Sequence, residues 1–209
     1  MEIYKPVLFN SDMVQALLDG RKEVTRRVVK PQPAGQLHRM PDSMCWSGYF
    51  ANSEEENVYK PPYQPGNILW VREAFSIDYL SNIPGRGRVR YKAGGYMDIR
   101  FSPDRYDMMR RAQKKPGWRP SENMPREAAR IFLRVTNVYV KRLRDVNYFD
   151  CLAEGIPYRQ METDIVQDFA ALWDQTISSK DRPLYGWEAN PYIWVIEFEH
   201  TAKPDRWPC

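Results

Sequence analysis

The chain has few of the residues that build metal sites and disulfide frameworks. Its 209 residues include three cysteines (Cys45, Cys151 and Cys209) and two histidines (His38 and His200). The cysteines are odd in number and far apart, so their spacing defines neither a disulfide framework nor a zinc site. We therefore expect no metal and no cofactor.

Long hydrophobic runs are also missing. No stretch approaches the roughly 18 uncharged apolar residues that a membrane-spanning helix needs. The first residues, MEIYKPVLFN, lack the basic start and long apolar stretch of a secretory signal. These absences predict a cytoplasmic protein that does not associate with a membrane.

The composition is that of a globular protein with a sizeable core, because 43% of the residues are hydrophobic and 13% are aromatic. The chain holds 17 prolines, with clusters at 31–33, 61–65 and 116–125. Such clusters predict long ordered loops between strands.

Positive charge is concentrated in residues 79–120. This segment holds eleven Lys and Arg against three Asp, a net +8, whereas the whole chain carries +4. A local positive field suits phosphate-bearing partners, and a merely solvated loop is the alternative. The candidate nucleic-acid contacts are Arg110, Arg111, Lys114 and Lys115.

Strands outnumber helices in the hydrophobic pattern. We expect strands at 68–75, 88–92, 131–143 and 192–200, a strand in RKEVTRRVV, and an irregular region from there to Gly66. Helices are expected from Ser11 or Asp12 to Gly20, at 104–114, in NYFDCLAEG and at 163–177. Because these elements do not alternate in a βαβ order, we predict an α+β fold, a mixed and mostly antiparallel β-barrel with peripheral helices. It would form one domain over 1–209, with a basic insertion at about 76–125.

A short motif follows the first expected helix. Gly20, Lys22, Thr25 and Arg27 form the pattern G-x-K-x-x-T-x-R. The chain here resembles the ASCH family of the PUA-like superfamily, whose general pattern is G-x-K-x-x-E-x-R. With threonine in place of glutamate, it looks like the bacterial branch that hydrolyses N4-acetylcytidine to cytidine and acetate. The resemblance implies a PUA-like barrel and a catalytic set of Lys22, Thr25 and Glu154.

The resemblance runs nearly end to end. PGNILWVREAF, WRPSENMPREAARIFLRV, LAEGI and WEANPYIWVIEFE are similar to stretches of the larger, prophage-type ASCH proteins. The weakest part is 75–115, which the small hydrolases lack.

Hydrolysis of such an amide needs an activated nucleophile, a proton donor for the leaving amine and a stabilised oxyanion. Lys22 can act as a base only if its pKa falls from about 10.4 toward about 7–8. Burial and the neighbouring arginines favour that shift, whereas Glu154 favours the ammonium and an electrostatic role. Thr25 would be the nucleophile or would orient a water. Glu154, in the last turn of a short helix, would shuttle the proton; a fully exposed glutamate is the alternative.

The backbone between Gly20 and Arg26 is expected to be irregular. On a flat strand, residues three apart point to opposite faces, so Lys22 and Thr25 could not converge. We therefore predict a turn or β-bulge within KEVT.

Four further residues are candidates for substrate binding: Arg27, Glu73, Trp70 and Asn190. Glu73 shares a strand face with apolar residues, so we expect it to form a buried ion pair with Arg27 or Lys22. The alternative is that Glu73 lines a pocket. Trp70, like Tyr192 and Trp194, would stack a base or fill the core. Asn190 would read a base edge.

Two classes of function follow. The first is a metal-independent amidohydrolase that acts on N4-acetylcytidine or a related acylated nucleoside. The second is a non-catalytic module that binds single-stranded RNA or DNA through the basic segment. A ribonuclease is a third and weaker hypothesis, because no histidine pair supports it.

Overall fold

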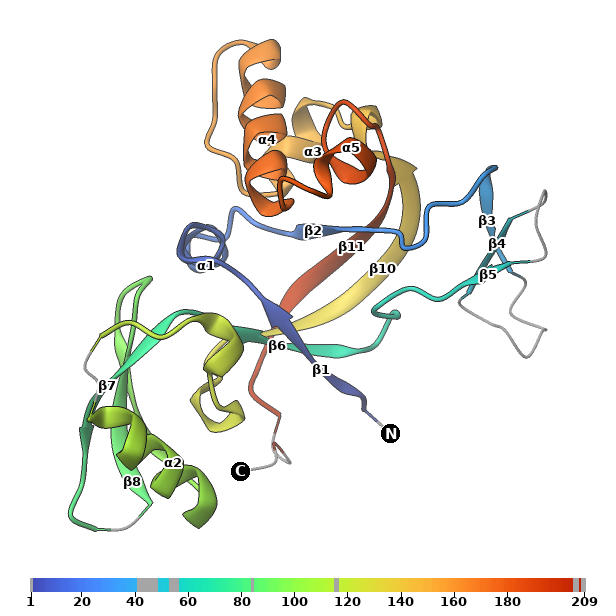
Figure 1. Cartoon of the computed structure of the whole chain (residues 1–209). Coiled ribbons are helices and arrows are strands. Elements are labelled where there is room, and N and C mark those ends of the chain that lie inside the picture. The colour runs from blue at the N-terminus through green and yellow to red at the C-terminus, as the bar shows by residue number, and fades with distance from the viewer. Residues whose placement is uncertain are drawn as a thin grey trace. The chain divides into compact units, whose positions relative to one another are not determined.

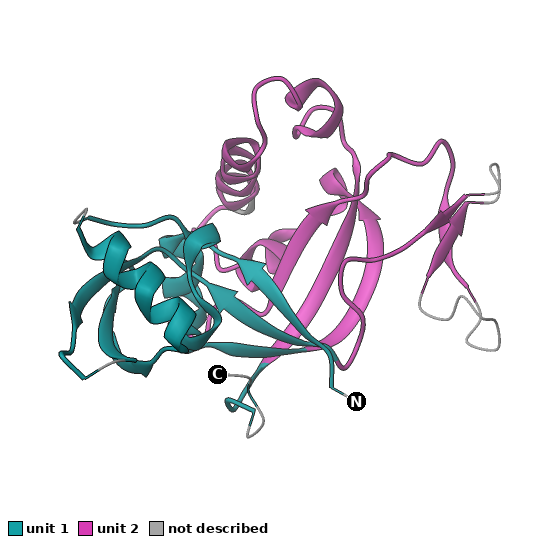
Figure 2. Cartoon of the chain, turned by 60° about the horizontal axis from the view of Figure 1, so that its bottom comes forward, with its two compact units in different colours: residues 1–18, 67–134, 200–209 teal, residues 19–66, 135–199 magenta. Residues whose placement is uncertain are grey.

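A computed structural model describes residues 2–40, 49–52, 57–83, 85–114, 117–204 and 207. The chain divides into two compact units, coloured in Figure 2. Unit 1 comprises residues 1–18, 67–134 and 200–209, and unit 2 comprises residues 19–66 and 135–199. The expected basic insertion at 76–125 lies within unit 1. The single-domain assignment stays a prediction.

Unit 1 is built from a parallel strand pair, an antiparallel meander and short helices. Its elements are β1 (Tyr4–Leu8), α1 (Ser11–Leu18), β6 (Ile68–Arg72), β7 (Phe75–Leu80), β8 (Arg86–Tyr91), β9 (Tyr96–Arg100), α2 (Pro103–Gln113), the 3-10 helices η1 (Ser121–Asn123) and η2 (Arg126–Ala128), and the start of β10 (Phe132–Arg142). β6 pairs in parallel with β1 and antiparallel with β10. β7, β8 and β9 form the meander.

Unit 2 joins antiparallel strands to three helices. Its elements are β2 (Val24–Val28), β3 (Leu37–Arg39), β4 (Phe50–Asn52), β5 (Val58–Tyr59), the rest of β10, the 3-10 helix η3 (Leu143–Asp145), α3 (Tyr148–Ala153), α4 (Glu162–Thr176), α5 (Arg182–Tyr185) and most of β11 (Tyr192–Thr201). β2 pairs antiparallel with β11, and β3, β4 and β5 form a small antiparallel sheet. Figure 1 shows α3, α4 and α5 gathered near one end of β10 and β11.

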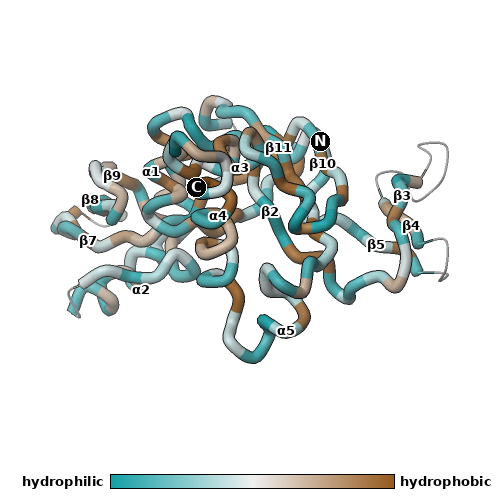
Figure 3. Tube along the Cα trace, turned by 90° about the horizontal axis from the view of Figure 1, so that it is seen from above, coloured by the Kyte–Doolittle hydropathy of each residue, from teal (hydrophilic) through white to brown (hydrophobic). Residues whose placement is uncertain are grey.

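Each unit has its own hydrophobic core. In unit 1, Trp70, Phe75, Tyr91 and Phe132 pack with Trp207. In unit 2, the core joins the helices to the strands and includes Leu143, Cys151, Ile165, Phe169 and Ile193. In the hydropathy colouring of Figure 3, β10 and β11 carry brown stretches and α2 is mostly hydrophilic. Burial of these apolar side chains is the main force that holds the strands in place.

The observed class is α+β with mostly antiparallel pairing, as predicted. The strand pairing of the described residues does not show a closed barrel, so the barrel stays a prediction. None of the helices in the described ranges is long and apolar enough to cross a membrane.

Three local expectations were wrong. The expected strand at 68–75 is broken into β6 and β7, and at the break Glu73 donates its backbone N–H to Met124 Sδ (3.2 Å). The region expected to be irregular up to Gly66 contains β3, β4 and β5. The side chain that caps α1 is that of Asn10, whose Oδ1 accepts from the Met13 N–H at 2.8 Å, in place of Ser11 or Asp12.

Candidate functional site

The loop before β2 positions Lys22. Gly20 has a φ of 70°, the left-handed conformation that ends α1, and the backbone is irregular until Val24. The Glu23 N–H donates to the Ala153 carbonyl at 2.8 Å and thereby ties this loop to α3. The expected irregularity is therefore present as a loop before the strand. The register between β2 and β11 is regular from Val24 to Val28, so the bulge alternative was wrong.

Lys22 and Glu154 form a buried ion pair. Lys22 Nζ donates to Glu154 Oε1 at 2.7 Å and to the Glu154 carbonyl at 2.9 Å. The Lys22 side chain is 0% exposed and that of Glu154 is 6% exposed. The alternative of a fully exposed Glu154 was therefore wrong. Two residues 132 positions apart in the chain meet at this point.

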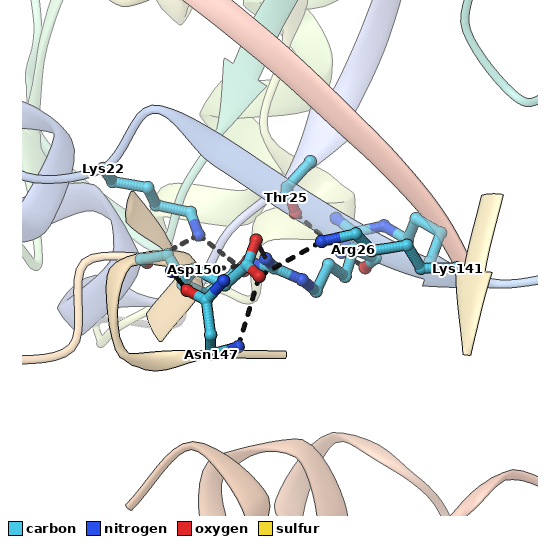
Figure 4. Close-up of polar contacts among 8 residues, drawn as sticks. Lys22, Thr25, Arg26, Lys141, Asn147 and Asp150 are labelled. Carbon is cyan, nitrogen blue, oxygen red and sulfur yellow. Dashed lines mark hydrogen bonds and ion pairs between the residues drawn. The ribbon is translucent and has the colours of Figure 1, made fainter. Parts of the chain in front are cut away.

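Arg26 extends the pair into a network. Its guanidinium donates to Glu154 Oε2 at 2.5 Å and to Asp150 Oδ1 at 2.9 Å. Lys141, on β10, donates to the other Asp150 oxygen at 3.2 Å. Figure 4 shows Lys22 and Arg26, from the loop and strand β2, and Lys141, from β10, approaching the region of Asp150.

A capping box fixes the acidic side of the network. The Asn147 side chain accepts from the Asp150 N–H at 2.9 Å, and the Asp150 side chain accepts from the Asn147 N–H at 3.2 Å. Asp150 and Glu154 are four residues apart and so share one side of α3 and its C-terminal end. The helix thus presents both carboxylates to the cations.

Thr25 lies beside Arg27. It is buried, and its Oγ1 accepts from Arg27 Nη1 at 3.1 Å, as Figure 4 also shows at the labelled Thr25. Strand alternation places Thr25 and Arg27 on one face of β2 and Arg26 on the other. Arg27 Nη1 also donates to the Arg26 carbonyl at 2.9 Å, and the Arg27 charge acts on Lys22.

Burial controls the protonation of Lys22. It lowers the pKa of the Lys22 ammonium below its ordinary value. The charge and hydrogen bond of Glu154 oppose this shift, and the charges of Arg27 and Arg26 reinforce it. The sequence led us to expect that burial lowers this pKa and that Glu154 raises it, and the effect of burial is the larger. A lysine with a lowered pKa is a candidate proton acceptor.

The network carries more cations than carboxylates. Lys22, Arg26 and Lys141 face Glu154 and Asp150. Arg26 Nε is buried and makes no hydrogen bond within the described part of the chain. This arrangement can move a proton between an amine and a carboxyl group, and it can stabilise a negative charge that develops nearby.

Glu73 lies in unit 1 and belongs to another ion pair. It is 1% exposed and accepts two hydrogen bonds from Arg130, at 2.7 and 2.8 Å. The prediction of a buried ion pair is confirmed, but the proposed partners Arg27 and Lys22 were wrong. Burial raises the pKa of Glu73, although Arg130 opposes the shift.

The remaining candidates for substrate binding have structural contacts. Trp70 is in unit 1, where it packs against Trp207 with ring centroids 5.8 Å apart. Asn190 accepts from the Arg144 N–H at 2.8 Å through Oδ1 and from Arg142 at 3.1 Å through its carbonyl. Its φ of 46° marks the tight turn before β11.

The basic candidates lie on α2 and just after it. Arg110, Arg111 and Lys114 are exposed, and Lys115 lies outside the described residues. Cys151 is buried in the core of unit 2, whereas Cys45 and Cys209 lie outside the described residues. Within the described ranges, His, Cys, Asp and Glu side chains form no group that could hold a metal ion.

Sequence reasoning missed the contacts of Arg26, Asp150 and Lys141 in this network. A signal for Asp150 was present, because its spacing of four from Glu154 predicts a shared helix side. For Lys141 no signal existed, since its contact depends on where β10 passes α3. Comparison of the chain with family models, curated proteins and solved structures gives no match.

Proposed function

We propose that this protein is an ASCH-type amidohydrolase that removes the acyl group from N4-acetylcytidine or a related acylated nucleoside. The single observation that carries the proposal is the buried pair of Lys22 and Glu154, in which burial lowers the pKa of the lysine. The antiparallel pairing of β2 with β11, which holds Thr25, supports a PUA-like barrel as the scaffold.

The proposed reaction uses each group once. Neutral Lys22 takes the proton from the attacking oxygen, which is that of Thr25 or of a water that Thr25 orients. The oxygen bonds to the acyl carbon, and the guanidinium groups of Arg26 and Arg27 stabilise the oxyanion. Glu154 relays the proton from Lys22 to N4 as the C–N bond breaks. When Thr25 is the nucleophile, a water then hydrolyses its acyl ester. The products are cytidine and acetate.

The test is incubation of the purified protein with N4-acetylcytidine and chromatographic measurement of free cytidine. Lys22→Met and Thr25→Val keep the side-chain volume nearly constant, and each should lower the rate by about 100-fold or more, the usual contribution of a general base or nucleophile. Lys180→Ala removes an exposed lysine of the same unit and should leave the rate unchanged. Absence of cytidine with the wild-type protein, or full activity in Lys22→Met, would refute the proposal.

A second candidate function is the non-catalytic binding of single-stranded RNA or DNA. The observation that favours it is the row of exposed cations on and after α2, Arg110, Arg111 and Lys114. These side chains would contact phosphates without regard to sequence.

A further inference from the structure

Unit 1 contains a pocket of about 610 Å³, a volume typical of small-ligand sites. It lies between β1, β6, α2 and the segment that holds η1 and η2. Polar and apolar side chains both line it. The residues that matter here are Trp70, Arg72, Arg105, Met108, Arg119 and Arg126.

The lining is rich in positive charge. Four arginines line the pocket, and Glu122 is the one carboxylate among the described lining residues. Arg72 donates to the backbone carbonyl of Glu122, and Arg119 donates to that of Ala112. Because these acceptors are neutral, the hydrogen bonds orient the guanidinium groups without neutralising their charge.

Guanidinium groups of this lining retain buried donors without an acceptor. Arg72 Nε and Arg126 Nε are shielded from solvent and make no hydrogen bond in the described part of the protein. Burial lowers the pKa of Arg72, Glu122 opposes the shift, and the charge of Arg105 reinforces it. A bound anion would supply the missing acceptors and the missing charge.

Flat apolar surface adjoins the charge. The guanidinium carbons of Arg72 and Arg126 lie 5.5 and 4.5 Å from the ring centroids of Trp70 and Trp207. This stacking holds the guanidinium groups of Arg72 and Arg126 in place. Trp70 and Met108 line the same pocket. A ligand that fits this lining has an anionic end and a planar, weakly polar end.

We infer that this pocket binds a nucleotide, with the phosphate on the arginines and the base against Trp70 and Met108. Arginine matches phosphate oxygens through paired hydrogen bonds, and aromatic and apolar side chains pack on any base. A free nucleotide and the terminal nucleotide of a single strand offer the same chemistry. The inference does not rest on hydrolysis at Lys22, because the two sites use different residues in different units.

The experiment is isothermal titration of the full-length protein with CMP, cytidine, inorganic phosphate and a pentanucleotide with or without a 5′ phosphate. The key variant is Arg105→Glu, which changes an exposed side chain on α2 that lines the pocket. The matched control is Arg100→Glu, with the same charge change on an exposed residue of β9 in the same unit but outside the described lining. Lys180→Ala, at an exposed residue of unit 2, is a second control, and circular dichroism verifies the fold of each variant.

The expected result is saturable binding of CMP and weaker or no binding of cytidine. Arg105→Glu should weaken CMP binding by about 10-fold or more, because it removes a charged donor to the phosphate, and Arg100→Glu and Lys180→Ala should change it less than about threefold. Tighter binding of the 5′-phosphorylated pentanucleotide than of CMP would identify the end of a strand as the ligand of this pocket. The reverse order would identify a free nucleotide as the ligand. Equal losses in Arg105→Glu and Arg100→Glu, or no saturable binding of any phosphate probe, would overturn the inference.

Discussion

Lys22 is a charged side chain that the fold places out of water. A buried ammonium loses hydration, and only part of that loss is recovered from Glu154, so burial lowers its pKa. The lowered pKa of Lys22 affects both the rate of the proposed reaction and the stability of the fold, and each effect can be measured.

The pH dependence of hydrolysis distinguishes the two roles of Lys22. If Lys22 is the base, kcat/KM for N4-acetylcytidine should rise with pH and level off below 10.5, the ordinary pKa of the group. An electrostatic role needs the ammonium, and kcat/KM would then fall over the same range. Initial rates from pH 5 to 10 decide between these roles, with Lys180→Ala as the control.

Stability should depend on pH in the same range. Between the lowered pKa of folded Lys22 and 10.5, the unfolded chain holds a proton that the folded chain has released. The free energy of unfolding therefore rises with pH across this window, and the cost of charging is fully present below it. Lys22→Met removes this contribution, so the stability of the wild type relative to Lys22→Met should increase as the pH rises toward 10.5. Urea unfolding at several pH values measures the difference, and a constant difference would contradict the prediction.

At the scale of elements, α3 is a short helix that carries both carboxylates of the network. Six residues are too few for a helix to be stable by itself, so its N-terminal capping box and its packing hold it. The cap thus contributes to the position of Glu154 at the other end.

Removal of the cap should weaken the site. Asn147→Ala should lower the free energy of unfolding by about 1 kcal/mol, the usual cost of removing an N-cap. Asn147→Asp keeps the acceptor oxygen and is the matched control. Chemical denaturation measures both variants, and equal stability of Asn147→Ala and the wild type would show that the cap contributes nothing.

Another buried ion pair lies at the break between β6 and β7. Glu73 is buried at this break and is held by Arg130, whose guanidinium carbon lies 3.9 Å from the Tyr91 ring centroid. Glu73→Ala leaves Arg130 without its carboxylate partner and should cost about 3–5 kcal/mol. Asp78→Ala breaks the exposed pair with Arg90 and should cost at most about 1 kcal/mol. Thermal unfolding compares the two, and similar losses would refute the assignment of Glu73 as a structural residue.

At the scale of the whole molecule, charge is unevenly distributed along the chain. Residues 79–120 carry a net +8 although the whole chain carries +4. Long polyanions respond to such a field through counterion release, whereas a mononucleotide responds mainly to the groups that touch it.

Binding of single-stranded RNA should therefore weaken as salt increases. The triple variant Arg110→Glu, Arg111→Glu and Lys114→Glu should lower the affinity and reduce the slope of log K against log salt, by about 0.7 for each phosphate that the protein no longer neutralises. Fluorescence anisotropy at several salt concentrations measures both. An unchanged slope in the triple variant would show that these side chains do not bind the strand.

Several features could be predicted from local sequence. The helices expected at 163–177 and in NYFDCLAEG are present as α4 and α3. The pairing of Lys22 with Glu154 was expected through a resemblance. The partner of Glu73 could not be predicted, because Arg130 is 57 residues away and nothing in the spacing marks it.

The sequence by itself determined the longer elements, such as α4, β10 and β11, and which residue types are available for proton transfer, because both depend on neighbours along the chain. Only the tertiary structure decided that Lys22 is buried against Glu154, that Thr25 meets Arg27, and that Arg72 and Arg126 line one pocket. These arrangements depend on contacts between distant segments, where desolvation and charge act through space and no local pattern records them.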